Sequence, residues 1–249
     1  MKYIVLDLEF NQAFDFGNGD SQTPDERCPF EIIQIGAVRL NSSFKHEASL
    51  NLLIEPVIYK KLHPYVRRIT GLSNASLRNK QSFEEAFSKL IEFTGKKRAI
   101  YCVWGANDIK ELRKNIEYYN LSNGSSDIDF IDVQNIASKY LNRVSGMCVG
   151  LKNAVNALDI EIDKPFHNAL NDAEYTAKIL QRLKREPWSI MQYTHDNIIK
   201  TAPQPSKIDF VTLYNAIESK IGRALTTSER WIFKNAYLGG KAKRVDKNN

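Results

Sequence analysis

Cysteine and histidine are scarce in this sequence. Its 249 residues include three cysteines and four histidines. Cys28, Cys102 and Cys148 lie far apart, and none has a second thiol or a histidine at the spacing of a metal site. These counts argue against a disulfide framework and against a structural zinc site. Cys102 lies in an apolar stretch, so we interpret it as a small core residue. A nucleophilic role would need an activating base, and its neighbours in the sequence offer none.

Long hydrophobic runs are also absent. No window approaches the roughly 18 uninterrupted apolar residues that a membrane span needs. The N-terminus reaches Asp7 too soon for a secretory signal, so we expect a cytoplasmic protein without membrane contact. Hydrophobic residues make up 43% of the chain and charged residues 26%, which is ordinary for a globular protein and excludes a disordered chain.

Acidic residues become scarce toward the C-terminus. Residues 187–249 contain 10 Lys and Arg but 5 Asp and Glu, a net of +5, whereas the first 186 residues contain 25 and 24. The overall net charge of +6 therefore lies almost wholly in the last quarter of the chain. Such an asymmetry suits a polyanionic partner, although a basic surface without any partner is the alternative.

Apolar runs rich in β-branched residues predict five strands, and stretches with helical periodicity predict the helices. The strands are expected at residues 2–10, 31–40, 47–55, 98–104 and 128–132. A capping box of Ser82 and Glu85 begins one helix, and further helices are expected at residues 107–118, 133–141, 150–158 and 168–186. This order predicts an α/β fold with a mixed five-stranded sheet, in which three antiparallel strands precede two parallel ones.

The chain is predicted to form two domains. Pro187 ends the last long helix, which puts a main domain at residues 1–186 and a basic helical extension at residues 187–249. Within the extension, helices are expected at residues 209–221 and 227–238. The main domain also contains a polar loop from Asn11 to Phe30, and loops of this length tend to be functional or mobile.

Two acids lie on the first predicted strand. Asp7 and Glu9 are two residues apart, so both side chains leave the same face of the strand. Carboxylates on an otherwise apolar strand are costly unless a cation neutralises them. An exposed strand end is the alternative explanation.

Two further blocks carry acids at the starts of helices. Asp108 follows the fourth strand, and it could simply favour the helix dipole there. His167 precedes the last long helix, and Asp172 lies in its first turns. A histidine in a loop suits a general base near neutral pH; an ordinary helix start is the alternative. Together, four carboxylates and one histidine are what two hard divalent cations and an activated water require.

These blocks resemble the exonuclease motifs of the DEDDh branch of the DnaQ-like superfamily, which has an RNase H-like fold. Asp7 and Glu9 match the first motif, Asp108 the second, and His167 with Asp172 the third. The segments Glu31–Gly36 and Thr70–Leu72 add supporting matches, and the resemblance covers about residues 1–186. The pattern Trp104-Gly105-x-x-Asp108 is similar to Eri-type exoribonucleases and their bacterial relatives. Phe10-Asn11 departs from the threonine-rich sequence usual in proofreading subunits.

The resemblance implies a 3′–5′ exonuclease that releases nucleoside 5′-monophosphates with two Mg²⁺ or Mn²⁺ ions. Asp7, Glu9, Asp108 and Asp172 would bind the metals, and His167 would be the general base. The expected partners are 3′ ends of single-stranded RNA or DNA, with RNA slightly favoured. Phe10, Thr70 and Gly71 are candidate substrate-binding residues, with core packing as the alternative for Phe10.

Several alternatives remain at this point. A DNA proofreading or repair exonuclease would use the same chemistry, and a catalytically silent nucleic-acid-binding module would keep only the fold. The basic extension could lengthen the nucleic-acid track, or it could be a solubilising appendage or a homodimer element that buries its aromatic residues. The basic residues concerned are Lys207, Lys220, Arg223, Arg230, Lys234, Lys241, Lys243 and Arg244, and the aromatic ones are Trp231, Phe233 and Tyr237.

Overall fold

The computed structural model describes residues 2–17, 21–95, 99–121, 128–141, 147–193, 198–200, 210–226 and 229–230. These fall into two compact units, Met1–Pro203 and Gln204–Asn249. Of the predicted helix at 227–238 only residues 229–230 are described, and they are helical; most of the basic and aromatic residues of the extension lie outside the described residues. Within the described part, every helix is too short or too polar to cross a bilayer.

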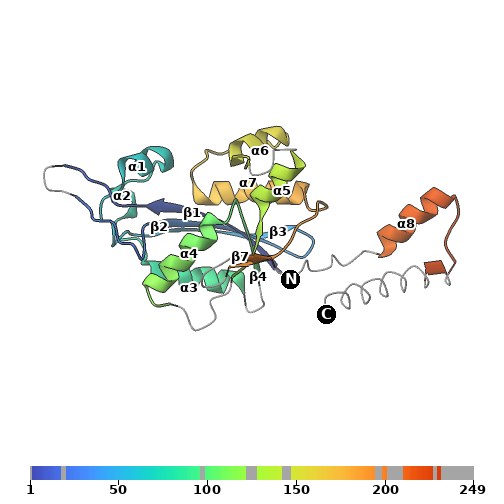
Figure 1. The fold of residues 1–249 in the computed structure, drawn as a ribbon, viewed down its shortest axis with the longest axis horizontal. Helices are drawn as coiled ribbons and strands as arrows, with labels where there is room; N and C mark the ends of the chain where they lie inside the picture. Colours follow the sequence, from blue (N-terminus) through green and yellow to red (C-terminus); the bar gives the residue numbers. More distant parts are fainter. Residues whose placement is uncertain are drawn as a thin grey trace. The chain divides into compact units, whose positions relative to one another are not determined.

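The first unit is built on a seven-stranded mixed sheet in the order β3-β2-β1-β4-β5-β6-β7 (Figure 1). The strands are β1 (Lys2–Asn11), β2 (Glu31–Leu40), β3 (His46–Leu53), β4 (Ala99–Val103), β5 (Ile128–Asp132), β6 (Met191–Tyr193) and β7 (Ile198–Lys200). The pairs β1–β2 and β2–β3 are antiparallel, whereas β1–β4 and β4–β5 are parallel. The five predicted strands and their directions are therefore confirmed.

Two strands were missed, and they change the expected domain boundary. β6 pairs antiparallel with β5, and β7 pairs antiparallel with β6. The chain thus returns to the sheet after Pro187, and the first compact unit ends at Pro203 instead of residue 186. The physical reason is that a proline ends a helix without ending the domain that contains it.

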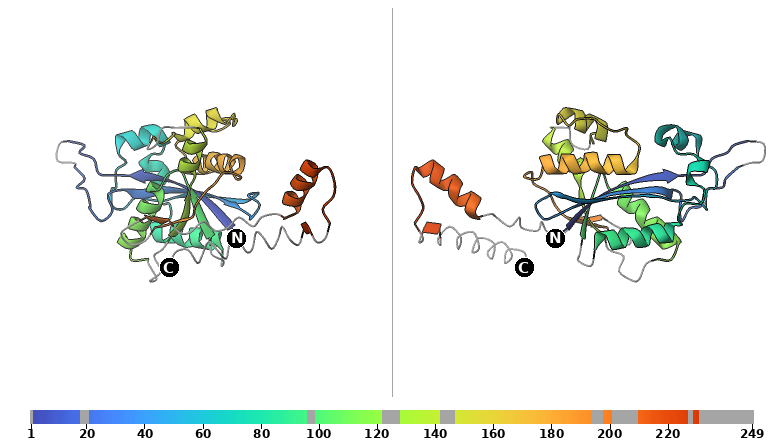
Figure 2. Two further views of the ribbon diagram at one scale, coloured as in Figure 1. Left: turned by 45° about the vertical axis from the view of Figure 1, so that its right-hand side comes forward. Right: turned by 180° about the vertical axis from the view of Figure 1, so that it is seen from behind.

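Helices cover both faces of the sheet, as the two views of Figure 2 show. One face packs against α5 (Val133–Tyr140), α6 (Leu151–Ala157) and α7 (Ala169–Arg182) through a core that includes Val5, Val38 and Ala173. The other packs against α3 (Phe83–Thr94) and α4 (Asn107–Tyr118). Cys102 is fully buried, as expected of a core residue, and burial raises the pKa of its thiol, which disfavours a nucleophilic role.

Two short helices follow β3. They are α1 (Pro64–Thr70) and α2 (Asn74–Leu77), and they form a small core with Ile33 of β2. Figure 1 places them beside the carboxyl end of β1. In the second unit the described helix is α8 (Phe210–Ile221), which agrees with the helix predicted at 209–221.

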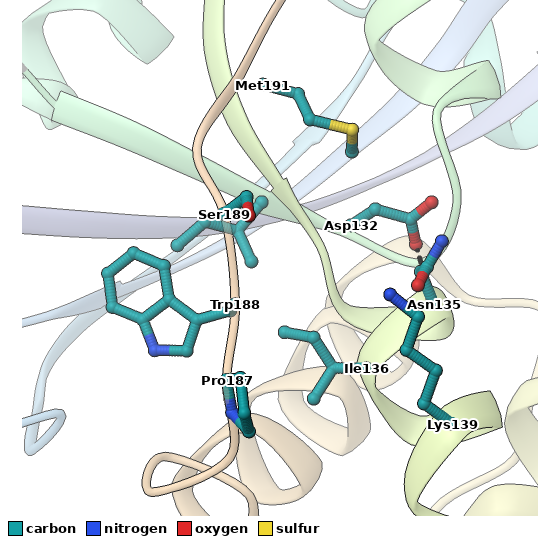
Figure 3. Close-up of a pocket in the computed structure, with 9 residues that line it drawn as sticks. Asp132, Asn135, Ile136, Lys139, Pro187, Trp188, Ser189 and Met191 are labelled. Atoms are coloured by element: carbon teal, nitrogen blue, oxygen red, sulfur yellow. Dashed lines mark hydrogen bonds between the residues drawn. The ribbon is translucent and has the colours of Figure 1, made fainter. Parts of the chain in front are cut away.

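A cavity of about 70 Å³ lies between α5 and the segment that leads to β6 (Figure 3). Trp188 and Ser189 line one side, and Ile136 and Lys139 of α5 face them. Asp132 borders the cavity and accepts a hydrogen bond from the Asn135 backbone N–H at 2.8 Å, which caps α5. None of the predicted catalytic residues is among those that line this cavity.

Candidate active site

β1 positions two carboxylates at its carboxyl end, in the middle of the sheet. Tyr3 and Val5 point into the core beneath α7, and alternation along the strand puts Asp7 and Glu9 on that same face. The antiparallel register pairs Asp7 with Gly36 and Glu9 with Gln34 of β2. Both acids therefore face the side of the sheet on which α7 lies.

The N-terminus of α7 rests directly on β2 at Gly36. A Cβ atom there would lie 2.0 Å from the Ala169 carbonyl carbon, far inside van der Waals contact, so only glycine allows the approach. Next to it, the Ala169 backbone N–H donates to Gln34 Oε1 at 3.3 Å. This hydrogen bond joins residues 135 positions apart and fixes where the start of α7 stands over β1.

The turn before α7 brings His167 and Asp172 together. The His167 backbone is left-handed, with φ of 63°, a conformation that costs free energy and often occurs at functional sites. Its N–H donates to Asp172 Oδ2 at 3.0 Å. The other oxygen, Asp172 Oδ1, is buried and has no hydrogen-bond partner among the residues that the structure describes. One side of the carboxylate is therefore held by the turn, while the other is left to a further ligand.

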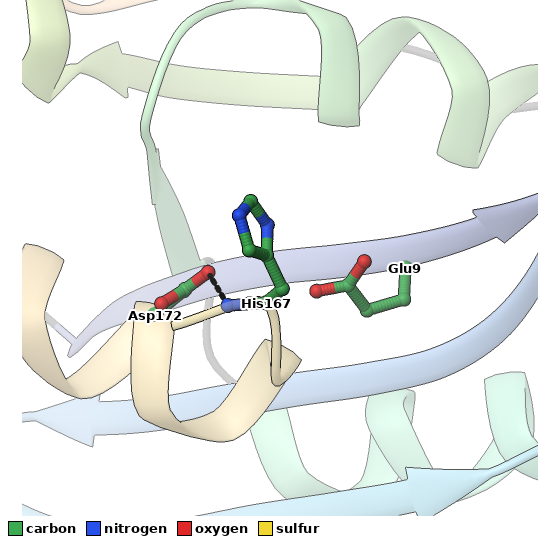
Figure 4. Close-up of side chains that lie close together, drawn as sticks. All are labelled: Glu9, His167 and Asp172. Atoms are coloured by element: carbon green, nitrogen blue, oxygen red, sulfur yellow. Dashed lines mark hydrogen bonds between the residues drawn. The ribbon is translucent and has the colours of Figure 1, made fainter. Parts of the chain in front are cut away.

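Glu9, His167 and Asp172 meet above β1 (Figure 4). One ligand atom from each lies within 4.8 Å of the other two, a spacing that suits a shared metal ion. Glu9 and Asp172 are buried, whereas His167 is exposed. In Figure 4 the imidazole stands between the two carboxylates.

Asp108 reaches the same region from the far end of β4. The turn after β4 contains Gly105 with φ of 88°, and Asp108 follows it in the first turn of α4. Burial and the charges of Glu9 and Asp172 raise the pKa of Asp108 well above its usual range. A carboxylate whose main partner was the helix dipole would have a lowered pKa. Burial first, and the neighbouring carboxylates second, therefore outweigh any effect of the helix dipole on Asp108.

The pKa values of the other three carboxyl groups are also raised, which favours their neutral forms. Burial, followed by the charges of Asp108, Asp172 and Glu9, raises the pKa of Asp7 well above its usual range. Burial and Asp172 raise the pKa of Glu9 to about 8. Burial raises the pKa of Asp172, and the nearby His167 N–H offsets part of that rise. Four crowded carboxylates of this kind need positive charge to stay ionised near neutral pH.

Divalent cations fit this donor set. Its ligands are hard carboxylate oxygens, which Mg²⁺ and Mn²⁺ prefer. Within the described part of the chain, no lysine or arginine offsets the charge of the four acids. Asp172 Oδ1, which lacks a hydrogen-bond partner among the described residues, offers a specific ligand atom for a cation.

The three predicted substrate-binding residues lie around the carboxyl end of β1. Phe10 is half-buried, packs against the core on the α3–α4 side, and its ring centre lies 6.2 Å from that of Phe30. The Thr70 hydroxyl donates to the Val66 carbonyl at 2.8 Å, so it serves the end of α1. Gly71 ends α1 with φ of 70° and has open space where a side chain would stand.

Polar residues that organise the site were not singled out from the sequence. Asp132 accepts hydrogen bonds from the backbone N–H groups of Asn135, Gln134 and Gly105, which ties the Asp108 turn to α5. Glu31 is 2% exposed and accepts from the N–H groups of residues 57, 58 and 59 at 2.6, 2.9 and 2.8 Å. The sequence signal that could have identified them is an acid at the end of an apolar strand, because such a side chain needs hydrogen-bond partners when it is buried.

Comparison with known proteins identifies a family. The model of the RNase_T family, described as exonuclease, matches residues 4–180. No curated protein sequence matches the chain. Three solved structures illustrate the likeness in fold, each at low sequence identity.

A 3′-exonuclease that recognises the 3′ end of a histone mRNA stem-loop superposes with a TM-score of 0.66, at 15% identity, over 81% of this chain and 90% of that one. The nuclease domain of 3′hExo, a DEDDh family member bound to rAMP, gives a TM-score of 0.61 at 17% identity, over 74% and 92%. E. coli exonuclease I with a dA16 oligonucleotide gives 0.54 at 18% identity, over 74% of this chain and 41% of that one. These structures share the RNase H-like fold predicted from the sequence. The chain belongs to the RNase_T exonuclease family, within the DnaQ-like 3′–5′ exonuclease superfamily that its motifs indicate.

Proposed function

We propose that this exonuclease shortens single-stranded nucleic acid from its 3′ end, releases nucleoside 5′-monophosphates and depends on two Mg²⁺ or Mn²⁺ ions. The observation that carries the proposal is the meeting of Glu9, His167 and Asp172 within 4.8 Å, with Asp7 and Asp108 acting electrostatically on the same group. Three segments far apart in the sequence supply these five side chains.

The four carboxylates would hold the metals. We infer that Asp7, Glu9 and Asp172 would hold one ion and that Asp7 and Asp108 would hold the other. When bound, the ions would lower the pKa of a water molecule and offset the negative charge that develops on the phosphoryl group. The carboxylates thereby stay ionised at neutral pH in spite of their burial.

His167 would remove the proton from the attacking water. Its ring is exposed while its backbone N–H is fixed to Asp172, so the imidazole can turn toward a water molecule without moving the carboxylate. A histidine can take up and release a proton near neutral pH, as a general base must. The hydroxide would attack phosphorus in line, and the bond to the 3′ oxygen would break.

RNA is slightly favoured as substrate. The motif Trp104-Gly105-x-x-Asp108 resembles that of Eri-type exoribonucleases. Of the similar structures, one is of a 3′-exonuclease that recognises a histone mRNA stem-loop, and another is bound to rAMP. Exonuclease I, however, was solved with DNA oligonucleotides, which keeps a DNA repair or proofreading role as the second candidate. We further propose a cytoplasmic location, and either a track for nucleic acid or a homodimer contact for the basic extension.

The test is digestion of 5′-labelled single-stranded RNA and DNA of equal sequence, with Mg²⁺, with Mn²⁺ and with EDTA. We expect a ladder that shortens from the 3′ end, depends on the metal, appears sooner with RNA, and is absent for Asp7→Asn. A ladder that persists in EDTA or in Asp7→Asn would contradict the proposed metal chemistry. Metal-induced stabilisation with no ladder on either substrate would favour the catalytically silent binding module.

A further inference from the structure

We propose that the surface formed by α1 and the start of the 11–30 loop binds the nucleic-acid strand on the 5′ side of the scissile phosphate, without reading its sequence. This inference rests on the proposed function, because it assigns a second binding region to the same substrate. We call it the upstream surface. Its residues are Phe14, Phe16, Lys61, Tyr65, Arg67 and Arg68.

The upstream surface is strongly basic. It contains the cations Lys61, Arg67 and Arg68, which come from a stretch, residues 56–83, without aspartate or glutamate. On α1, Val66 is buried in the small core, while Tyr65, Arg67 and Arg68 are exposed. The Arg68 guanidinium lies 5.2 Å from the centre of the Tyr65 ring. Exposed cations without neighbouring acids in the sequence suit a phosphate backbone.

Aromatic rings lie next to these cations. The ring centres of Phe14 and Phe16 are 4.9 Å apart, and the ring of Phe14 lies 4.6 Å from that of His63, just before α1. The Lys61 ammonium lies 5.5 Å from the centre of the Phe16 ring. Both phenylalanines are only partly buried, although they belong to a polar loop. Half-exposed rings with adjacent cations are the combination that holds single strands by base stacking and phosphate binding.

One acid lies within the aromatic segment. Asp15 stands between Phe14 and Phe16 in the sequence, and its carboxylate accepts a hydrogen bond from the Gly17 backbone N–H at 2.9 Å. It is therefore engaged in the turn of its own loop, and the three cations of the upstream surface outnumber it.

Buried hydrogen bonds tie the upstream surface to the catalytic strand. Asn11 is fully buried and follows Glu9 by two positions. Its amide donates to the carbonyls of Tyr59 and Lys61 at 2.8 and 3.1 Å and accepts from the His63 N–H at 2.9 Å.

The loop itself is held from a second point. The Gln22 side chain donates to the Lys61 carbonyl at 3.0 Å and accepts from the Lys61 N–H at 3.1 Å. α1 also packs against β1. A strand bound on the upstream surface would consequently be presented at a fixed distance from the carboxylates, which is what positioning of a substrate requires.

The experiment measures affinity for a labelled oligonucleotide of about 12 nucleotides, a length within the usual site sizes for single strands. Fluorescence anisotropy in EDTA compares the wild type with Arg67→Ala/Arg68→Ala and with Phe14→Ala. The matched control is Lys184→Ala/Arg185→Ala, which removes two adjacent exposed cations at the opposite end of α7 from His167. Melting temperatures verify that each variant folds.

The arginine variant should bind about tenfold more weakly. The slope of the logarithm of its binding constant against the logarithm of the salt concentration should become shallower by about 0.7 for each phosphate that the protein no longer neutralises. Phe14→Ala should also weaken binding about tenfold. It should keep the wild-type salt dependence, because the ring stacks on a base and neutralises no phosphate. The control should match the wild type. Equal affinity of wild type and folded upstream variants, or an equal weakening in the control, would overturn the proposal.

Turnover separates this inference from the proposed function. On the longer oligonucleotide, kcat/KM of both upstream variants should fall about tenfold. On a dinucleotide, which has no further nucleotides on its 5′ side to bind the upstream surface, kcat/KM should stay at the wild-type value. Equal decreases on both substrates would show that α1 acts on the chemistry and would overturn the proposal. A wild type that cleaves neither substrate would contradict the proposed function, and the affinity measurements would still decide the upstream surface.

Discussion

Replacing Gly36 with alanine tests how the site is assembled. The new Cβ would lie 2.0 Å from the Ala169 carbonyl carbon, 2.2 Å from its oxygen and 2.2 Å from the Leu170 nitrogen. All three are backbone atoms, so no side-chain rotation relieves the overlap. To reach even a tight carbon–carbon separation of about 3.4 Å, the start of α7 would have to retreat by roughly 1.4 Å.

That retreat would move two candidate catalytic residues. His167 and Asp172 flank the point of closest approach, and the Ala169 hydrogen bond to Gln34, already 3.3 Å long, would break. Overpacking of this kind costs about 1–3 kcal/mol of unfolding free energy, and a displacement of about 1 Å at a catalytic group can lower the rate about a hundredfold. We therefore expect Gly36→Ala to lose both stability and most of its turnover.

The assay compares melting temperature, Mn²⁺-induced stabilisation and turnover. Gly150→Ala is the matched control, because Gly150 has φ of −71° and nothing within 4 Å of the added methyl group. It lies before α6, so it should cost at most about 1 kcal/mol as a helix N-cap change and leave turnover unaltered. If Gly36→Ala keeps wild-type stability and turnover, the close approach of α7 to β2 does not position the site.

Three further predictions follow from the charges and hydrogen bonds of the site. Since burial raises the pKa of Glu9 from 4.5 to about 8, the folded protein retains a proton that the unfolded chain releases. Unfolding free energy in EDTA should therefore fall as the pH rises from about 4.5 to about 8, by a few kcal/mol at most, in denaturant titrations. Mn²⁺ should abolish most of this fall; stability that rises over that range in EDTA would contradict the raised pKa. Replacing His167 with glutamine should lower kcat about 10²–10⁴-fold while Mn²⁺ still raises the melting temperature. A parallel loss of metal stabilisation would mean that His167 acts mainly as a ligand. Asp132→Ala should lower the unfolding free energy by about 1 kcal/mol or more and raise the Mn²⁺ concentration needed for half-maximal turnover, because the substitution removes the helix cap and the hydrogen bond from Gly105. Asp132→Asn, which can still cap α5, is the control, and equal metal requirements in both variants would argue against this role.

The main strands were predictable because each is a continuous apolar run. β1, β2 and β4 are buried on both faces, and such strands stand out in sequence. β6 has only three residues, all half-buried, which is too short a run for its sequence pattern to distinguish it from a loop. Its place in the sheet is set by pairing with β5, a tertiary interaction that a local pattern does not encode.

The site was predictable in its residues and less so in its geometry. Asp7 and Glu9 share a face because strand side chains alternate, and this can be inferred from their spacing. The close approach of α7 to Gly36 joins segments more than a hundred residues apart, so the sequence alone did not show it, and no residue type at position 167 signals its left-handed backbone. The roles assigned to the five residues remain predictions for experiment.

The most direct test of the account is anomalous diffraction from crystals of the protein soaked with Mn²⁺. Two anomalous peaks are expected among Asp7, Glu9, Asp108 and Asp172, one of them bound to Asp172 Oδ1, and both should disappear in Asp7→Asn crystals grown the same way. Peaks confined to other parts of the molecule, or undiminished peaks in the variant, would contradict the claim that these carboxylates form the metal centre of the exonuclease.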